Sequence, residues 1–276
     1  MKKKKLWSPQ PLKDNIKRFE YKSTTIAYKF YGEDKNKKTI LFFYGFAGNI
    51  EYLRYVGEEL GKYYSFLCVD YPGHGYSYGQ DKFSIPDFIE TVEKLLENLS
   101  IDKIYLYGYS FGGIVSLMFY ERNRAKVEKL ILLNSEYYFT YNFIKKIFYN
   151  VFLGILKIGL KFAIVDVAIP VLKDKYLTKE NYKLSAEVVL FNNHEAVIEF
   201  YKSIVFENFE PLLDNVDCPV LLVGSRIDFL ISKGRFKNFH SKLKNSELFM
   251  VKDVGHLVVA TNPYPALKKS LEFLRK

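Results

Sequence analysis

The chain has 276 residues, of which 49% are hydrophobic and 26% are charged. This composition allows a sizeable buried core and excludes a wholly disordered chain. The formal net charge of +10 comes mostly from lysines scattered along the sequence, and no nucleic-acid recognition motif accompanies it, so we expect no nucleic-acid partner.

The chain starts with a run of lysines at residues 2–5, and polar residues and prolines follow at residues 8–11. A secretory signal peptide needs an apolar segment after its positive charges, which this stretch lacks. Cys68 and Cys218 lie beside apolar runs and have no partners at zinc-ligand spacing. We therefore expect a cytoplasmic protein with two free thiols and with neither a metal nor a cofactor.

Short apolar runs rich in β-branched and aromatic residues recur along the chain. Most of them are continuous rather than alternating, which is typical of strands buried on both faces of a parallel sheet. The predicted strands cover residues 25–31, 39–45, 65–71, 103–109, 129–135, 219–225 and 247–253. Helical patterns cover residues 84–100, 111–123 and 264–276. This alternation predicts an α/β fold, a mostly parallel central sheet flanked by helices.

The alternation stops between about residues 136 and 213, where helical patterns replace the strands. An apolar run at residues 151–172 is long enough to suggest a transmembrane helix. Lys157, Lys161 and Asp166 within that run argue against a membrane span and favour a helical cap over the sheet. The predicted domains are a core of residues 1–136 and 213–276 and an inserted cap of residues 137–212.

Two stretches match the pattern Gly-x-Ser-x-Gly, which places a nucleophilic serine on a tight turn from a strand into a helix. "GYSFG", residues 108–112, follows a strand-like run directly and leads into a helical pattern. "GYSYG", residues 75–79, is separated from its strand by a turn cluster and is followed by polar residues. We therefore predict Ser110 as the nucleophile and place Ser77 in a surface loop.

A serine nucleophile needs a base, and histidine is the usual one. Among the four histidines, His256 follows a predicted strand and a turn, at the sheet edge where functional residues gather. His74, His194 and His240 are more typical of surface positions. We therefore predict His256 as the base.

A carboxylate that orients the histidine should also follow a strand. Asp228 comes just after the apolar run of residues 220–223 and is the predicted third member. Glu136 follows the strand of residues 129–135 and is an alternative, because a carboxylate there can also reach the histidine. Asp253, three residues before His256, is interpreted as a residue that caps a turn.

With these residues placed, the chain resembles the α/β-hydrolase superfamily of serine hydrolases with a helical cap, in particular its esterase and monoacylglycerol-lipase-like members. The order serine, aspartate, histidine is that of the family. "DYPGHGYS", residues 70–77, resembles the family's D-x-x-G-x-G-x-S loop, which explains the second match to the serine pattern. The resemblance covers nearly the whole chain from about residue 17.

"FYGFAGN", residues 43–49, resembles the family's oxyanion loop, H-G-x-x-G. The resemblance implies an oxyanion hole formed by the backbone N–H groups of Phe46 and Phe111. Tyr44 stands where the family usually has histidine. That departure puts the hydrogen bonding inside the loop in doubt rather than the chemistry.

The resemblance implies a hydrolase that cleaves a carboxylic ester of a small molecule through an acyl-enzyme intermediate. The Phe-, Ile-, Leu- and Val-rich cap suits an apolar acyl group, and equally suits packing of the cap onto the core. The oligomeric state is left open, and a basic, aromatic cap also suits weak association with an anionic membrane surface. The alternatives are a thioesterase, an acyltransferase or a C–C bond hydrolase on the same triad, and a non-catalytic binding protein of the same fold.

Overall fold

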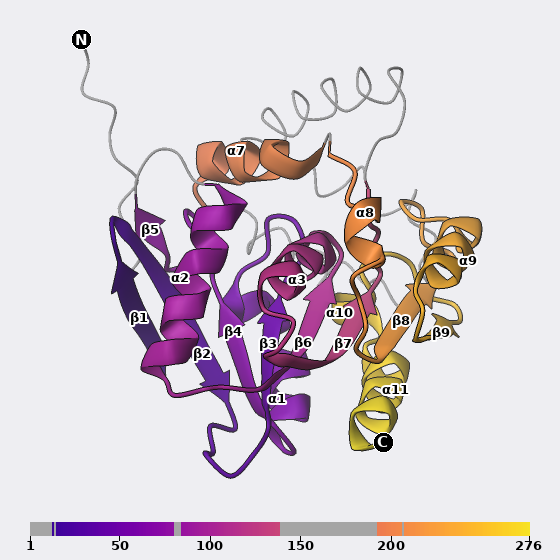
Figure 1. Cartoon of the computed structure of the whole chain (residues 1–276), viewed down its shortest axis with the longest axis horizontal. Helices are drawn as coiled ribbons and strands as arrows, with labels where there is room; N and C mark the ends of the chain where they lie inside the picture. The colour runs from indigo at the N-terminus through magenta and orange to yellow at the C-terminus, as the bar shows by residue number, and fades with distance from the viewer. Residues whose placement is uncertain (1–12, 14, 80–83, 139–191, 206) are drawn as a thin grey trace.

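The computed structural model describes residues 13, 15–79, 84–138, 192–205 and 207–276 (Figure 1). The strands are β1 (Ile16–Tyr21), β2 (Thr24–Tyr31), β3 (Thr39–Phe43), β4 (Ser65–Val69), β5 (Tyr78–Gly79), β6 (Ile104–Tyr109), β7 (Val127–Leu133), β8 (Val220–Ser225) and β9 (Ser246–Val251). The helices are η1 (Ile50–Leu53), α1 (Arg54–Gly61), α2 (Ile85–Asn98), α3 (Phe111–Arg122), α7 (His194–Val205), α8 (Glu210–Leu213), α9 (Lys233–Lys242), α10 (Val258–Thr261) and α11 (Tyr264–Arg275).

The strands form one sheet in the order β1-β2-β4-β3-β6-β7-β8-β9, with β5 paired to β2. The pairs from β4 through β3, β6, β7 and β8 to β9 are all parallel, whereas β2 runs antiparallel to β1 and β4. All seven predicted strands and the three predicted helices are confirmed. The predicted α/β fold with a mostly parallel sheet is therefore correct.

The centre of the sheet is buried on both faces, as the continuous apolar runs predict. Every residue of β3, β4 and β8 is buried. Aromatic rings join neighbouring strands: the Phe42 ring centroid lies 5.3 Å from that of Phe66 and 5.1 Å from that of Tyr107. Removing this apolar area from water is the main stabilising contribution to the fold.

Helices cover both faces of the sheet (Figure 1). Helices α2 and α3 contact each other on one face, and α1 and α11 contact each other on the opposite face. Helix α7 lies across the edge of the sheet where β3 and β6 end (Figure 1). The parallel strands therefore direct their carboxyl ends, and the loops that follow them, toward α7.

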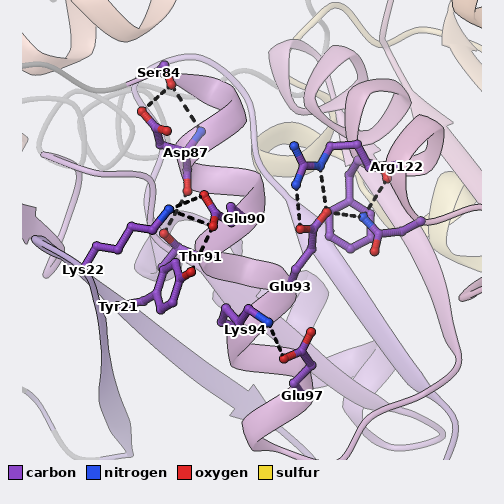
Figure 2. A network of polar contacts seen from close by, with 12 residues as sticks. Tyr21, Lys22, Ser84, Asp87, Glu90, Thr91, Glu93, Lys94, Glu97 and Arg122 are labelled. Atoms are coloured by element: carbon purple, nitrogen blue, oxygen red, sulfur yellow. Dashed lines mark hydrogen bonds and ion pairs between the residues drawn. The ribbon is translucent and has the colours of Figure 1, made fainter.

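Polar contacts fasten the outer side of α2 to two neighbouring elements (Figure 2). Glu90 accepts hydrogen bonds from the hydroxyl of Tyr21, the last residue of β1 (2.9 Å), and from Nζ of Lys22 in the turn that follows (2.8 Å). One turn further on, Glu93 accepts a two-pronged contact from Arg122 (2.9 and 2.8 Å) at the end of α3. Water competes for most of these surface contacts, so they fix the direction of α2 more than they stabilise the fold.

The tight passage from β6 into α3 depends on glycines. A Cβ atom on Gly112 would lie 2.0 Å from the Phe43 carbonyl oxygen and 2.6 Å from the Tyr44 carbonyl oxygen, both on the main chain. A Cβ on Gly108 would lie 2.6 Å from the Gly112 carbonyl oxygen. The two glycines of "GYSFG" are therefore required for the close packing of this helix on the sheet.

We expect Gly112→Ala to lower the free energy of unfolding by about 3 kcal/mol or more, because strand β3 must move to make room. Gly234→Ala is the matched control, since the nearest atom to its added Cβ is Ser232 Oγ at 3.8 Å. Alanine there should be neutral or stabilising by up to about 1 kcal/mol. Urea unfolding of both variants measures the difference, and equal losses would show that the packing at Gly112 is not limiting.

Of the predicted cap, residues 139–191 and 206 lie outside the described residues, and so does the apolar run of residues 151–172. The division into core and cap stays a prediction. No helix in the described part of the chain is long and apolar enough to cross a membrane. Cys68 is buried, Cys218 is half-buried, and both are free thiols as predicted.

Candidate active site

Ser110 lies at the junction of β6 and α3, where the chain turns sharply. Its φ of 51° and ψ of −119° are unusual for a residue with a side chain. The turn is held by the Ser110 N–H, which donates to the Leu133 carbonyl on β7 at 2.9 Å. The Ser110 side chain makes no capping hydrogen bond to α3. Its Oγ instead lies 2.8 Å from Nε2 of His256.

His256 is held in the loop between β9 and α10 through its main chain. The Tyr109 hydroxyl donates to the His256 carbonyl at 2.9 Å. The buried Asn134 amide donates to the same carbonyl at 3.1 Å and to the Gly255 carbonyl at 3.2 Å. Asn134 was not predicted from the sequence, although a polar residue directly after an apolar strand lies at the sheet edge where functional residues gather.

Asp228 completes a line of three side chains. Its Oδ2 lies 2.7 Å from Nδ1 of His256. Its Oδ1 accepts the backbone N–H groups of Leu230 (2.8 Å) and Ile231 (3.0 Å) in the loop between β8 and α9. The carboxylate is thus fixed by its own loop, with one oxygen directed at the imidazole. The three predicted residues, which lie far apart in sequence, meet at one edge of the sheet.

The alternative carboxylate, Glu136, is directed elsewhere. Its Oε2 lies 2.6 Å from Nε of Arg235, and its side chain is only 2% exposed. Arg235 also donates to the Tyr138 carbonyl at 2.9 Å. Asp253 is exposed in the turn after β9. Asp228 is therefore the carboxylate that the structure places beside His256.

The loop of residues 70–77 is buried, which corrects the predicted surface position of Ser77. The Ser77 hydroxyl accepts the Ala27 N–H at 2.7 Å and donates to the Asp70 carbonyl at 2.8 Å. Ser77 therefore joins this loop to strand β2. The sequence pattern could not reveal this burial, because it arises from strand β2 and helix α7 packing over the loop.

The predicted surface position of His74 is also wrong. The ring is buried, with its centroid 5.5 Å from that of Tyr71 and 5.9 Å from that of Phe200. His240 is half-buried on α9, and its Nδ1 lies 2.8 Å from Ser246 Oγ. His194 is the first residue of α7.

The two residues predicted for the oxyanion hole lie close to the serine and to each other. Phe46 belongs to a turn in which the Gly48 N–H donates to the Gly45 carbonyl at 3.1 Å. This turn passes next to Ser110, because a Cβ on Gly45 would lie 3.2 Å from the Ser110 Cβ. Phe111, which follows the serine, lines the same small cavity as Phe46.

That cavity is too small to hold a water molecule and is surrounded mainly by rings. Helix α7 contributes Phe200 and Tyr201 to its wall, and the loop of residues 70–77 contributes Tyr71 and His74. The Tyr201 ring centroid lies 4.6 Å from that of Phe46. The surroundings of Phe46 and Phe111 are therefore aromatic.

Tyr44 supports the predicted oxyanion loop of residues 43–49. Its buried hydroxyl accepts the Tyr71 N–H at 2.7 Å and donates to Asp70 Oδ1 at 3.3 Å. The Tyr71 hydroxyl in turn donates to the Tyr44 carbonyl at 2.9 Å. The loop is thus hydrogen-bonded through tyrosine where the family usually has histidine, which answers the doubt raised by the sequence.

The pKa values of two buried ionisable groups near the site are shifted in opposite directions. Burial lowers the pKa of His74 to about 4. Burial raises the pKa of Asp70 to about 7, against the hydrogen bonds from the N–H groups of Tyr76 and Ile50 and from the Tyr44 hydroxyl. His74 therefore contributes stability above its unfolded-state pKa of about 6.5, and this contribution is lost as the pH falls toward 4. Asp70 contributes stability below about pH 4, and this contribution is lost as the pH rises toward 7.

We expect the two effects to offset each other in the natural protein and to separate in His74→Phe, which keeps a ring between Tyr71 and Phe200. In the natural protein, lowering the pH from 6.5 to 4 reduces the free energy of unfolding by up to about 3 kcal/mol through His74. The variant lacks this loss, because phenylalanine does not titrate. Stability of the variant relative to the natural protein should therefore rise as the pH falls. Urea unfolding between pH 4 and 7.5 measures this, and parallel pH profiles would contradict it.

A mostly parallel sheet, with a serine on the tight turn after a central strand, is the arrangement typical of α/β hydrolases. Residues 38–162 match the family model for the α/β hydrolase fold. In the described part of the chain, no group of three or more His, Cys, Asp or Glu side chains is arranged to hold a metal ion.

The comparisons with known proteins agree with this class. The chain is 23% identical over 246 residues to a provisionally named esterase/lipase of Haemophilus influenzae, covering 87% of this chain and 84% of that protein. A segment of 79 residues is 37% identical to 2-succinyl-6-hydroxy-2,4-cyclohexadiene-1-carboxylate synthase of Escherichia coli, covering 29% and 31%. The structure of a thermophilic esterase from Thermogutta terrifontis superposes with a TM-score of 0.82 at 20% identity, covering 94% and 98%. Together these matches support an α/β-hydrolase enzyme of the esterase/lipase type.

Proposed function

We propose that the chain is a serine hydrolase that cleaves a carboxylic ester, with Ser110 as nucleophile, His256 as general base and Asp228 as the orienting carboxylate. The observation that carries the proposal is the continuous line from Ser110 Oγ to His256 Nε2 (2.8 Å) and from His256 Nδ1 to Asp228 Oδ2 (2.7 Å). A base within this distance of a hydroxyl, itself held by a third group, is the arrangement that activates serine.

The reaction has two halves. His256 takes the proton of Ser110 as Oγ attacks the acyl carbon, and returns it to the alcohol that leaves. A water molecule then gives its proton to His256 and attacks the acyl-enzyme, which releases the carboxylic acid and restores Ser110. The N–H groups of Phe46 and Phe111 stabilise the oxyanion in both halves, and each such donor contributes about 3–4 kcal/mol.

The aromatic rings packed around Phe46 and Phe111, the latter next to Ser110 in the chain, favour an apolar acyl group as the substrate's acid part. A series of p-nitrophenyl esters tests this, with the acyl chain lengthened from acetate to octanoate. We expect kcat/KM to rise from acetate to the medium chains. Equal or falling values would remove the apolar acyl group from the proposal and leave the triad untouched.

A fluorophosphonate probe tests the nucleophile, because it reacts covalently with activated serines. We expect one label per chain and, after proteolysis, mass spectrometry should find it on the peptide that carries Ser110. A label on the peptide of Ser77, or no label on folded protein, would contradict the proposed site. Because the label is located on the natural protein, the result does not depend on whether a variant folds.

The same triad can serve a thioesterase, an acyltransferase or a C–C bond hydrolase. Acyl-thioesters, an added alcohol acceptor and a vinylogous 1,5-diketone distinguish them by their products. Flotation with anionic liposomes tests membrane-surface association, and the cytoplasmic location stays a prediction.

A further inference from the structure

A single buried amide, that of Asn192, joins two loops of the site to helix α7. Its Nδ2 donates to the Ala47 carbonyl at 2.7 Å and to the Gly48 carbonyl at 3.4 Å. Its Oδ1 accepts the Gly75 N–H at 2.8 Å. Only 4% of Asn192 is exposed, so these contacts form with little competition from water.

The carbonyls that Asn192 holds belong to the turn that carries Phe46. Ala47 has a φ of 55°, a backbone conformation that residues with a side chain rarely adopt. Such a conformation persists only where its surroundings fix it. The Asn192 amide fixes the Ala47–Gly48 peptide, and thereby the orientation of the turn whose first N–H is that of Phe46.

The start of helix α7, just after Asn192, is itself held against the loop of residues 70–77. The Asn193 N–H donates to the Gly73 carbonyl at 2.9 Å, and a Cβ on Gly73 would lie 2.3 Å from the Cβ of Ala196 on α7. Helix α7 is thus pressed against the loop of residues 70–77. Asn192 transmits this docked position of α7 to the oxyanion loop.

We propose that Asn192 is a positioning residue that holds the oxyanion loop in its productive orientation, and does so through the amide NH2 group. The inference rests on the proposed function, because it assigns the Phe46 N–H to the oxyanion hole. The alternative is that Asn192 only stabilises the fold. A structural role would change stability, whereas a positioning role also changes the binding of the transition state.

Two substitutions separate these roles. Asn192→Asp keeps an oxygen for the Gly75 N–H, but replaces the donor to Ala47 with a carboxylate that repels two carbonyl oxygens. Asn192→Ser removes both contacts without adding charge, and serves if the aspartate variant does not fold. Asn193→Ala is the matched control, since it removes the helix-capping contacts to the N–H groups of Glu195 and Ala196 and leaves the Asn192 amide in place.

The measurements are kcat and KM for a p-nitrophenyl ester, the inhibition constant of a trifluoromethyl ketone that forms a tetrahedral oxyanion adduct, and the melting temperature. We expect kcat to fall about 10- to 100-fold in both Asn192 variants, with KM changed less than about 3-fold. The inhibition constant should rise by the same factor as kcat falls. Asn193→Ala should lower the melting temperature and leave kcat within about 3-fold.

A folded Asn192 variant with the kcat and inhibition constant of the natural protein would overturn the inference. So would an equal loss of kcat in Asn193→Ala, because that would trace the effect to the helix end. In either case, fluorophosphonate labelling of Ser110 tests the proposed nucleophile independently of Asn192. Failure of the positioning role is thereby distinguished from failure of the proposed function.

Discussion

Ser110→Ala is expected to lower kcat for ester hydrolysis by a factor of about 10⁴ or more, because no acyl-enzyme can form without the hydroxyl. The rate that remains should come from the oxyanion donors and from substrate binding. The fold should be retained, since the Ser110 N–H bond to Leu133 and the backbone of the turn do not involve the side chain. Steady-state kinetics on p-nitrophenyl esters measures the loss.

The control for this experiment is the melting temperature of the same preparation, together with its far-UV circular dichroism. Both should match those of the natural protein. A folded Ser110→Ala variant that retains more than about 1% of the activity would contradict the assignment and point to another nucleophile or to water activated directly by His256.

Asp228→Asn is expected to lower kcat by about 10³- to 10⁴-fold, and the reason lies in the direction of its two contacts. The Leu230 and Ile231 N–H groups require an acceptor at the Oδ1 position, so the amide oxygen stays there. The amide NH2 then faces Nδ1 of His256 and donates to it. The imidazole proton is then on Nε2, so Nε2 can no longer accept the proton of Ser110.

Glu136→Gln is the matched control, because Glu136 is the other carboxylate that follows a strand at this edge. Its loss leaves the Arg235 charge without a buried partner, which should reduce stability by about 1–3 kcal/mol. The kcat should change less than about 3-fold. If Glu136→Gln lost activity as severely as Asp228→Asn, the assignment of the third residue would be wrong.

The sheet could be predicted from the sequence because its central strands are continuous apolar runs. When such runs alternate with helical patterns, they indicate buried strands of a parallel sheet. Strand β1 was missed, because half of its residues are charged and it is defined by pairing with β2 at the sheet edge. Helix α1 was missed as well: only four of its eight residues are buried, and two of those are glycines.

The choice of Ser110 over Ser77 depended on local context, the strand before and the helix after, and local context is what a sequence records. The burial of Ser77 and His74 depends instead on β2 and α7, which come from distant parts of the chain. Asn192 was missed for the same reason. Its three partners are main-chain atoms of two other loops, and a main-chain partner leaves no residue type to recognise.

The backbone at Ser110 has a consequence for how this chain can change over generations. A left-handed φ at a residue with a Cβ costs about 1–3 kcal/mol, and glycine would relieve most of that strain. A protein of this fold that only bound ligands would therefore gain stability by exchanging the serine for glycine, a single step. Serine at this position therefore costs stability, and the chemistry proposed for its hydroxyl is what offsets that cost.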